Sequence, residues 1–93
     1  MPSPKPITFT RHAWLRMQER SAHERDVRAA IRTGQRELAQ RGLSAHRLEV
    51  DFKREWQRRY YDVQEIEAIV AEEDESTVVV TVYTFYYRGR DRR

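Results

Sequence analysis

The first third of the chain repeats apolar positions with the period of an α-helix. Ala13, Trp14 and Met17 share one side of a helix over residues 11–20, and Thr10 is placed to cap its first turn. The pattern therefore predicts an amphipathic helix whose apolar side is pinned to a core.

A second helix is predicted over residues 22–33. Ser21 and Glu24 fit a capping box at its start, and Gly34 is expected as the left-handed residue after its end. Between these signals, apolar positions recur at intervals of three and four residues: Val27, Ala30 and Ile31. The two helices should thus follow each other with only a short turn between them.

The C-terminal third changes to the pattern of β-strands. Residues 77–87 are β-branched or aromatic, and residues 66–71 form a second strand pattern. The short polar segment 72–76 joins them as a hairpin, and residues 7–9 are expected to add a short edge strand. The predicted fold class is α+β, with two N-terminal helices packed on a C-terminal antiparallel β-sheet.

The middle segment, residues 43–62, fits two interpretations. Leu48, Val50 and Phe52 alternate with charged residues, which is typical of a strand. The same segment places Leu48, Phe52, Trp56 and Tyr60 at intervals of four residues, which suits a helix. The sequence leaves this choice open.

Size and composition place the chain among small domains. Its 93 residues suit one domain over residues 7–87, with an extended or disordered lead-in over 1–6 and a basic tail over 88–93. Cysteine is absent, and no apolar run approaches the roughly 20 residues that cross a bilayer. We therefore expect a cytoplasmic protein without membrane contact, and a homodimer is one way to cover so small a core.

Charge is unevenly distributed along the chain. Arginine supplies 16 of the 18 basic side chains, and its planar fork suits phosphate groups. Residues 1–61 carry a balance of +7 and residues 62–87 a balance of −7, which the tail brings to +3 overall. The basic part suits nucleic acid, and the acidic part suits a basic partner.

One imidazole and two guanidinium groups are predicted to form a row along the first helix. With His12 at 0°, Arg16 lies at about 40° and Arg20 at about 80°, on the border of the apolar stripe. A neutral imidazole can take the proton of a ribose 2′-hydroxyl, and guanidinium groups can hold the phosphate and stabilise its transition state. The row therefore suits phosphodiester cleavage in RNA, which carries its own nucleophile and needs no cofactor.

Further candidate residues lie on the strands. Thr81 and Tyr83 should share one face of the last strand, opposite a face formed by Val78, Val80 and Val82. Tyr83 could bind the phosphate, protonate the leaving oxygen or stack on a base. We expect the row to converge on a cleft beside Tyr83.

A second group of candidates mixes cations and aromatic rings, which suits single-stranded RNA. It comprises Arg58, Arg59, Tyr60 and Tyr61. The remaining histidines, His23 and His46, have no partners at the spacing that a zinc site requires, so no metal site is expected.

The segment around His12 resembles a bacterial family of small domains of unknown function with the motif H-A-x-x-R-M-x-x-R. His12, Arg16 and Arg20 match that motif, and residues 80–83 match its terminal V-T-V-Y-like strand. The family is similar to the RNase toxins of the barnase, EndoU, colicin D and RelE group. The resemblance implies a RelE-like fold and a metal-independent endoribonuclease whose site includes these residues with Thr81 and Tyr83.

The resemblance also implies partners and leaves alternatives. RNA is the expected substrate, either as messenger RNA on the ribosome or as transfer RNA, and an antitoxin protein is an expected partner. A non-catalytic RNA- or protein-binding module on the same fold would keep the arginines without needing His12. A third possibility is an interaction protein that binds through its sheet edge or its acidic hairpin.

Overall fold

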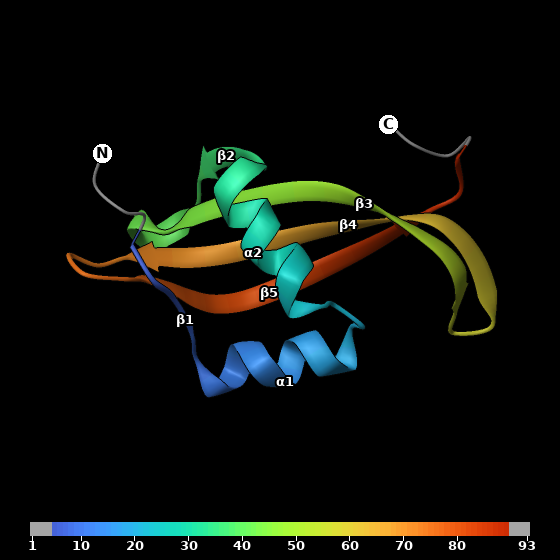
Figure 1. Ribbon diagram of the computed structural model, residues 1–93, viewed down its shortest axis with the longest axis horizontal. Coiled ribbons are helices and arrows are strands. Elements are labelled where there is room, and N and C mark those ends of the chain that lie inside the picture. Colours follow the sequence, from blue (N-terminus) through green and yellow to red (C-terminus); the bar gives the residue numbers. More distant parts are fainter. Residues whose placement is uncertain (1–4, 90–93) are drawn as a thin grey trace.

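The computed structural model describes residues 5–89 and consists of one five-stranded sheet with two helices (Figure 1). The strands lie in the order β1-β5-β4-β3-β2. Their bounds, with those of the helices, are β1 Ile7–Phe9, α1 Arg11–Glu19, α2 Glu24–Thr33, β2 Gln35–Leu38, β3 Ser44–Trp56, β4 Arg59–Glu72 and β5 Thr77–Tyr87, and a short 3-10 turn spans Gln40–Gly42. None of the helices in this part of the chain is long and apolar enough to cross a membrane.

The predicted α+β class is confirmed, and the helices precede most of the sheet in the chain. The prediction of an antiparallel sheet is wrong at one edge. Here β1 runs parallel to β5, with Ile7 opposite Thr77 and Phe9 opposite Val79. The sheet is therefore mixed, because the N-terminal segment joins the strand that comes last in the chain.

The first helix begins as its sequence indicates. The Thr10 hydroxyl accepts a hydrogen bond from the Ala13 N–H at 3.0 Å, which is the expected N-terminal cap. The cap expected at Ser21 is wrong, because Ser21 adopts a left-handed conformation (φ 57°) in the turn and α2 begins only at Glu24. Gly34 does end α2, but with extended rather than left-handed backbone (φ −77°, ψ 174°).

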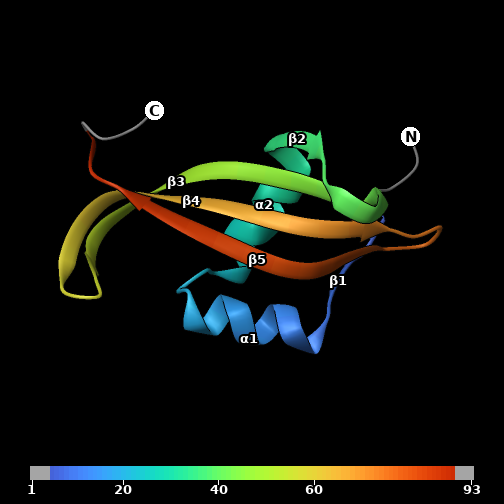
Figure 2. The same cartoon turned by 180° about the vertical axis from the view of Figure 1, so that it is seen from behind.

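The helices cover one face of the sheet and one edge (Figures 1 and 2). The α2 helix packs across β3 and β4, whereas α1 lies along β5. The buried core lies between them and is formed by Ile7, Ala13, Met17, Val27, Ala30, Ile66, Ala68, Val70, Val79 and Val82. The other face of β3, β4 and β5 is not covered by a helix and faces the viewer in Figure 2; we call it the open face.

A β-bulge in β5 changes which side chains point to the core. Ile69 pairs with Thr81 but the next residue, Val70, pairs with Val79, so Val80 is the extra residue. Val79 and Val82 are consequently both fully buried. The predicted face of Val78, Val80 and Val82 is therefore wrong, because strict alternation stops at the bulge.

The open question about residues 43–62 is resolved in favour of strands. β3 and β4 form a long antiparallel hairpin that extends beyond the rest of the sheet and curls at its tip (Figure 1). Near this end Tyr86 of β5 contacts three rings, with centroid distances of 5.1 Å to Phe52, 5.3 Å to Trp56 and 5.5 Å to Tyr61. Of the residues whose spacing of four resembled a helix, Phe52 and Trp56 lie in this cluster, whereas Leu48 packs against the core and Tyr60 is exposed.

The tip of this hairpin carries conformational strain that substitution should relieve. Gln57 and Arg58 both have positive φ, 51° and 70°, as the two central residues of a type I′ hairpin turn require. Asn and Gly adopt such angles at lower cost. We expect the double substitution Gln57→Asn and Arg58→Gly to raise the free energy of unfolding by about 1 kcal/mol in urea denaturation. An unchanged or lower value would contradict this assignment of strain.

A polar pair at one end of the core makes the stability of the fold depend on pH. His46 is only 5 % exposed, and burial lowers the pKa of its imidazole below the ordinary 6.5, with a further lowering by Arg36. Glu72 has its pKa lowered below 4.5, mainly by the hydrogen bond from Thr77. Each group therefore makes the free energy of unfolding depend on pH in its own range, His46 below 6.5 and Glu72 below 4.5.

We expect the free energy of unfolding to fall as pH drops below 6.5. The unfolded chain takes up a proton at His46 near that pH, whereas the folded protein does so only at lower pH. The slope from this group should not exceed about 1.4 kcal/mol per pH unit. Denaturation at about pH 7.5 and about pH 5.5 measures it. His46→Gln should reduce the difference, whereas the same change at exposed His23 should not; equal effects would contradict the prediction.

Candidate functional site

The α1 helix is fixed along the free edge of β5 at both of its ends. At the start, the Thr10 N–H donates to the Val79 carbonyl at 3.1 Å and the Thr10 hydroxyl to the Val80 carbonyl at 3.2 Å. At the end, Nη1 of Arg20 donates to the Val82 carbonyl at 2.7 Å. The helix and its cap therefore satisfy the Val80 and Val82 carbonyls, on the part of the β5 edge beyond its pairing with β1.

The side chain of Arg20 also contacts Tyr83. Its guanidinium carbon lies 5.1 Å from the centre of the Tyr83 ring, which is within the range of a cation–π interaction. Tyr83 is 42 % exposed, so part of its side chain remains accessible to a ligand. The contact gives the guanidinium group a defined position while leaving part of its charge accessible.

A network of buried and partly buried polar side chains holds the backbone at Arg20. The hydroxyl groups of Tyr86 and Thr84 donate to the Arg20 carbonyl, the latter at 3.3 Å. Gln64, which is nearly fully buried, donates through Nε2 to the Ser21 carbonyl at 2.9 Å and to the Tyr86 hydroxyl at 3.1 Å. Sequence reasoning missed these positioning residues, and a polar residue within the buried pattern of β4 was the available signal.

His12 and Arg16 lie between the two anchors of α1, on consecutive turns. His12 is exposed, and the described residues give it no hydrogen bond. Arg16 forms an ion pair with Glu19 three residues later. Of the predicted row, Arg20 is thus in contact with Tyr83, Arg16 is paired within its own helix, and His12 has its imidazole in solvent.

Thr81 and Tyr83 line a shallow pocket of about 310 Å³ on the open face. The bulge at Val80 brings this residue to the same pocket. The complete lining is Ala39, Gln40, Arg41, Leu43, Ile69, Val80, Thr81 and Tyr83. The only cation in this lining is Arg41, from the turn between β2 and β3, which sequence reasoning did not single out.

Acidic side chains occupy the open face next to Tyr83. Glu67 lies opposite Tyr83 in the register of β4 and β5. Arg47 of β3 forms ion pairs with Glu67 at 2.7 Å and with Glu37 at 2.6 Å. A polyanion at Tyr83 would be repelled from the rest of this face, so it would have to run past α1 or Arg41.

The second group of candidates is only partly available for stacking. Arg58, Arg59 and Tyr60 are exposed at the hairpin tip, with Tyr60 at 49 %. Tyr61 instead packs against Tyr86 in the aromatic cluster. This group lies at the opposite end of β4 from Ile69, so it is separate from the Tyr83 pocket.

Comparisons with known proteins identify a family for most of the chain. Residues 9–84 match the model of a family described as a domain of unknown function, DUF4258. No curated protein and no solved structure matches the chain. Across residues 5–89, no three His, Asp or Glu side chains are grouped to hold a metal ion.

Proposed function

Because the chain belongs to DUF4258, a family of domains of unknown function, its chemistry has to come from its own site, and we propose a metal-independent endoribonuclease of the toxin type. The observation that carries the proposal is the Arg20 guanidinium group over the Tyr83 ring at the rim of a pocket. We also infer a RelE-like fold, which is supported by two helices preceding a strongly twisted sheet.

The arginines would bind the scissile phosphate. Arg20 is already oriented by Val82 and Tyr83, so little conformational entropy is lost when it binds. Arg16 lies one turn earlier and can leave Glu19, because an exposed ion pair of this kind contributes at most about 1 kcal/mol. Two guanidinium groups on one side of α1 would then neutralise the charge that develops on the phosphoryl oxygens.

His12 would act as general base. Its imidazole takes the proton from the ribose 2′-hydroxyl, whose oxygen forms a new bond to phosphorus. The bond from phosphorus to the 5′-oxygen breaks, and the leaving oxygen receives a proton from the Tyr83 hydroxyl or from water. The products are a 2′,3′-cyclic phosphate and a 5′-hydroxyl end, and solvent then removes the proton from His12 and returns one to Tyr83. Thr81 lies in the same pocket to hydrogen-bond the substrate.

The hairpin tip would extend the RNA-binding surface. Arg58 and Arg59 can neutralise phosphates away from the cleavage point, and Tyr60 can stack on an unpaired base. The curled hairpin places these groups beyond the covered part of the sheet (Figure 1). A strand of RNA would need several nucleotides to contact both this tip and Tyr83.

The test is an assay of RNA cleavage with purified protein in the presence of EDTA. Single-stranded RNA and translating ribosomes serve as the two substrates, and the ends of the products are mapped. We expect 2′,3′-cyclic phosphate ends. Both substrates left as intact as with His12→Ala protein would contradict the proposal.

One observation favours a second candidate, an RNA-binding module without catalysis. Arg16 and Arg20 both have partners within the protein, and no side chain among the described residues orients the exposed imidazole of His12. Such a module would bind RNA with a steep dependence on salt and would bind equally well after His12→Ala. Salt-dependent binding of RNA without cleavage would support the binding module over the endoribonuclease. Both proposals include an antitoxin-like partner protein.

A further inference from the structure

A second pocket lies at the other end of the molecule from the β3–β4 tip. It has a volume of about 380 Å³ and combines apolar with charged walls. Its lining comes from α2, from β1 and the residues just before it, and from three further strands: Lys5, Ile7, Ile31, Arg32, His46, Glu72 and Thr77. It shares no residue with the Tyr83 pocket.

The pocket contains a buried imidazole with an unused hydrogen-bonding atom. His46 is almost completely buried, and its Nε2 has no hydrogen-bond partner within the described residues. A buried polar atom without a partner costs about 1–3 kcal/mol, so native proteins rarely retain one without a reason. A ligand that enters a pocket lined by this ring could supply the missing partner.

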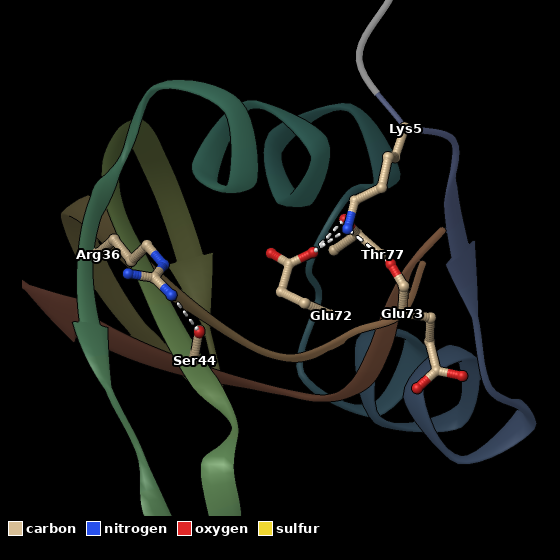
Figure 3. A network of polar contacts seen from close by, with 6 residues as sticks. All are labelled: Lys5, Arg36, Ser44, Glu72, Glu73 and Thr77. Atoms are coloured by element: carbon tan, nitrogen blue, oxygen red, sulfur yellow. Dashed lines mark hydrogen bonds and ion pairs between the residues drawn. The ribbon is translucent and has the colours of Figure 1, made fainter. Parts of the chain in front are cut away.

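The carboxylate in this pocket is already engaged by the protein. The Thr77 hydroxyl donates to Oε1 of Glu72 at 2.8 Å, and Nζ of Lys5 lies 3.2 Å from the same oxygen (Figure 3). Nζ of Lys5 also donates to the Glu73 carbonyl at 2.7 Å, as Figure 3 shows. Glu72 therefore stays ionised, and it orients the ammonium group at the mouth of the pocket.

The remaining charges around His46 are positive. Arg32 is exposed at the end of α2 and has no ion pair among the described residues. Arg36 of β2 lies opposite His46 in the strand register and donates to the Ser44 hydroxyl at 3.0 Å (Figure 3). The pocket lining thus carries Lys5 and Arg32 against the single carboxylate of Glu72, and Arg36 adds a third positive charge beside His46 from outside the lining.

We propose that this pocket binds a small phosphate monoester. The excess of positive charge favours a dianion over a carboxylate, which carries one charge. Arg32 offers the planar fork that suits phosphate, and Ile7 with Ile31 would contact the organic part of the ligand. The site is independent of the proposed nuclease function, since none of its residues takes part in that chemistry.

Binding should be coupled to uptake of a proton. The free protein holds His46 neutral through burial and the charge of Arg36, opposed by Glu72. A phosphate dianion beside the ring would favour the imidazolium form, because it attracts the positive charge and offsets that of Arg36. The pKa of His46 should therefore rise when the ligand binds.

The experiment titrates ¹⁵N-labelled full-length protein with inorganic phosphate, phenyl phosphate and benzoate at constant ionic strength, followed by NMR. We expect saturable shifts at Lys5, Arg32, His46 and Thr77, with phenyl phosphate bound more tightly than the other two. Arg32→Ala should weaken binding of phenyl phosphate at least roughly tenfold, since it removes a charged hydrogen bond. Arg25→Ala, on the exposed side of the same helix, should leave binding unchanged.

A second variant, His46→Gln, tests the role of the imidazole. It keeps a polar group in the pocket, and the same spectra show whether the protein is folded. It should abolish the pH dependence of phenyl phosphate binding that the wild-type protein shows. The proposal is overturned by any of three results: no saturable shift, equal binding of benzoate and phenyl phosphate, or equal binding by the Arg32→Ala and Arg25→Ala proteins.

Discussion

Replacement of His12 by alanine is expected to slow RNA cleavage by roughly 10²- to 10⁴-fold, the usual contribution of a general base. The side chain is exposed and no hydrogen bond in the described chain depends on it, so the fold should not change. The measurement is the single-turnover cleavage rate of a short labelled RNA, together with the thermal unfolding midpoint of each protein. A rate loss with an unchanged midpoint assigns the effect to chemistry.

Two further variants separate the roles within α1. Arg11→Ala removes a charge from the exposed side of the same helix and should change the cleavage rate less than about threefold, through weaker attraction of RNA alone. Arg20→Lys keeps the charge but loses the planar fork, and it should lower the rate while weakening RNA binding little. If His12→Ala and Arg11→Ala cleave RNA at the same rate, His12 is not the base.

Replacement of Gly34 by alanine should have the largest effect on stability, a loss of about 3 kcal/mol or more. A Cβ atom at this position would fall against the carbonyl oxygens of Ala30 in α2 and Arg47 in β3. Both are backbone atoms, so neither can turn away as a flexible side chain would. The helix would have to move off the strand, which would loosen the packing of α2 against β3 and β4. Urea denaturation followed by circular dichroism measures the loss.

The other glycines provide matched controls. A Cβ at Gly42 would meet only open space, but its positive φ of 74° means that alanine there is strained through the backbone by about 1 kcal/mol. Gly89 would place its Cβ 3.5 Å from a side-chain oxygen of Asp62, an ordinary contact. The expected order of destabilisation is Gly34, then Gly42, then Gly89, and a Gly42 variant less stable than the Gly34 variant would contradict it.

Local signals in the sequence predicted the elements that depend on local contacts. The cap at Thr10 needs only three following residues, and residues 77–87 are β-branched or aromatic throughout, the composition typical of strands. The helix cap predicted at Ser21 is absent, and the Ser21 carbonyl instead accepts a hydrogen bond from Gln64. That residue lies far along the chain, so the local capping pattern does not contain it. Residues 35–38 carried no strand signal, because every side chain of β2 is exposed and nothing alternates.

The candidate site also combines features that local sequence patterns predict with features that depend on tertiary contacts. The order of His12, Arg16 and Arg20 along one side of a helix follows from periodicity, and the pairing of Arg16 with Glu19 could have been read from their spacing. A cleft beside Tyr83 was expected, but which member of the row would contact the ring was not, because that depends on how α1 packs along β5. His46 would have been found with the strand interpretation of residues 43–62, since it shares a face with Leu48 and Val50.

The position of α1 against the last strand has a consequence for synthesis of the protein. Arg20 reaches its acceptor, the Val82 carbonyl, across a separation of 62 residues in the chain. A ribosome adds about 5–20 residues per second, so α1 emerges roughly 3–12 s before the strand that it packs against. During that interval Ala13 and Met17, which are buried in the folded protein, lack the contacts that α1 makes with β5. Arg20 and Tyr83 meet only when β5 has been translated.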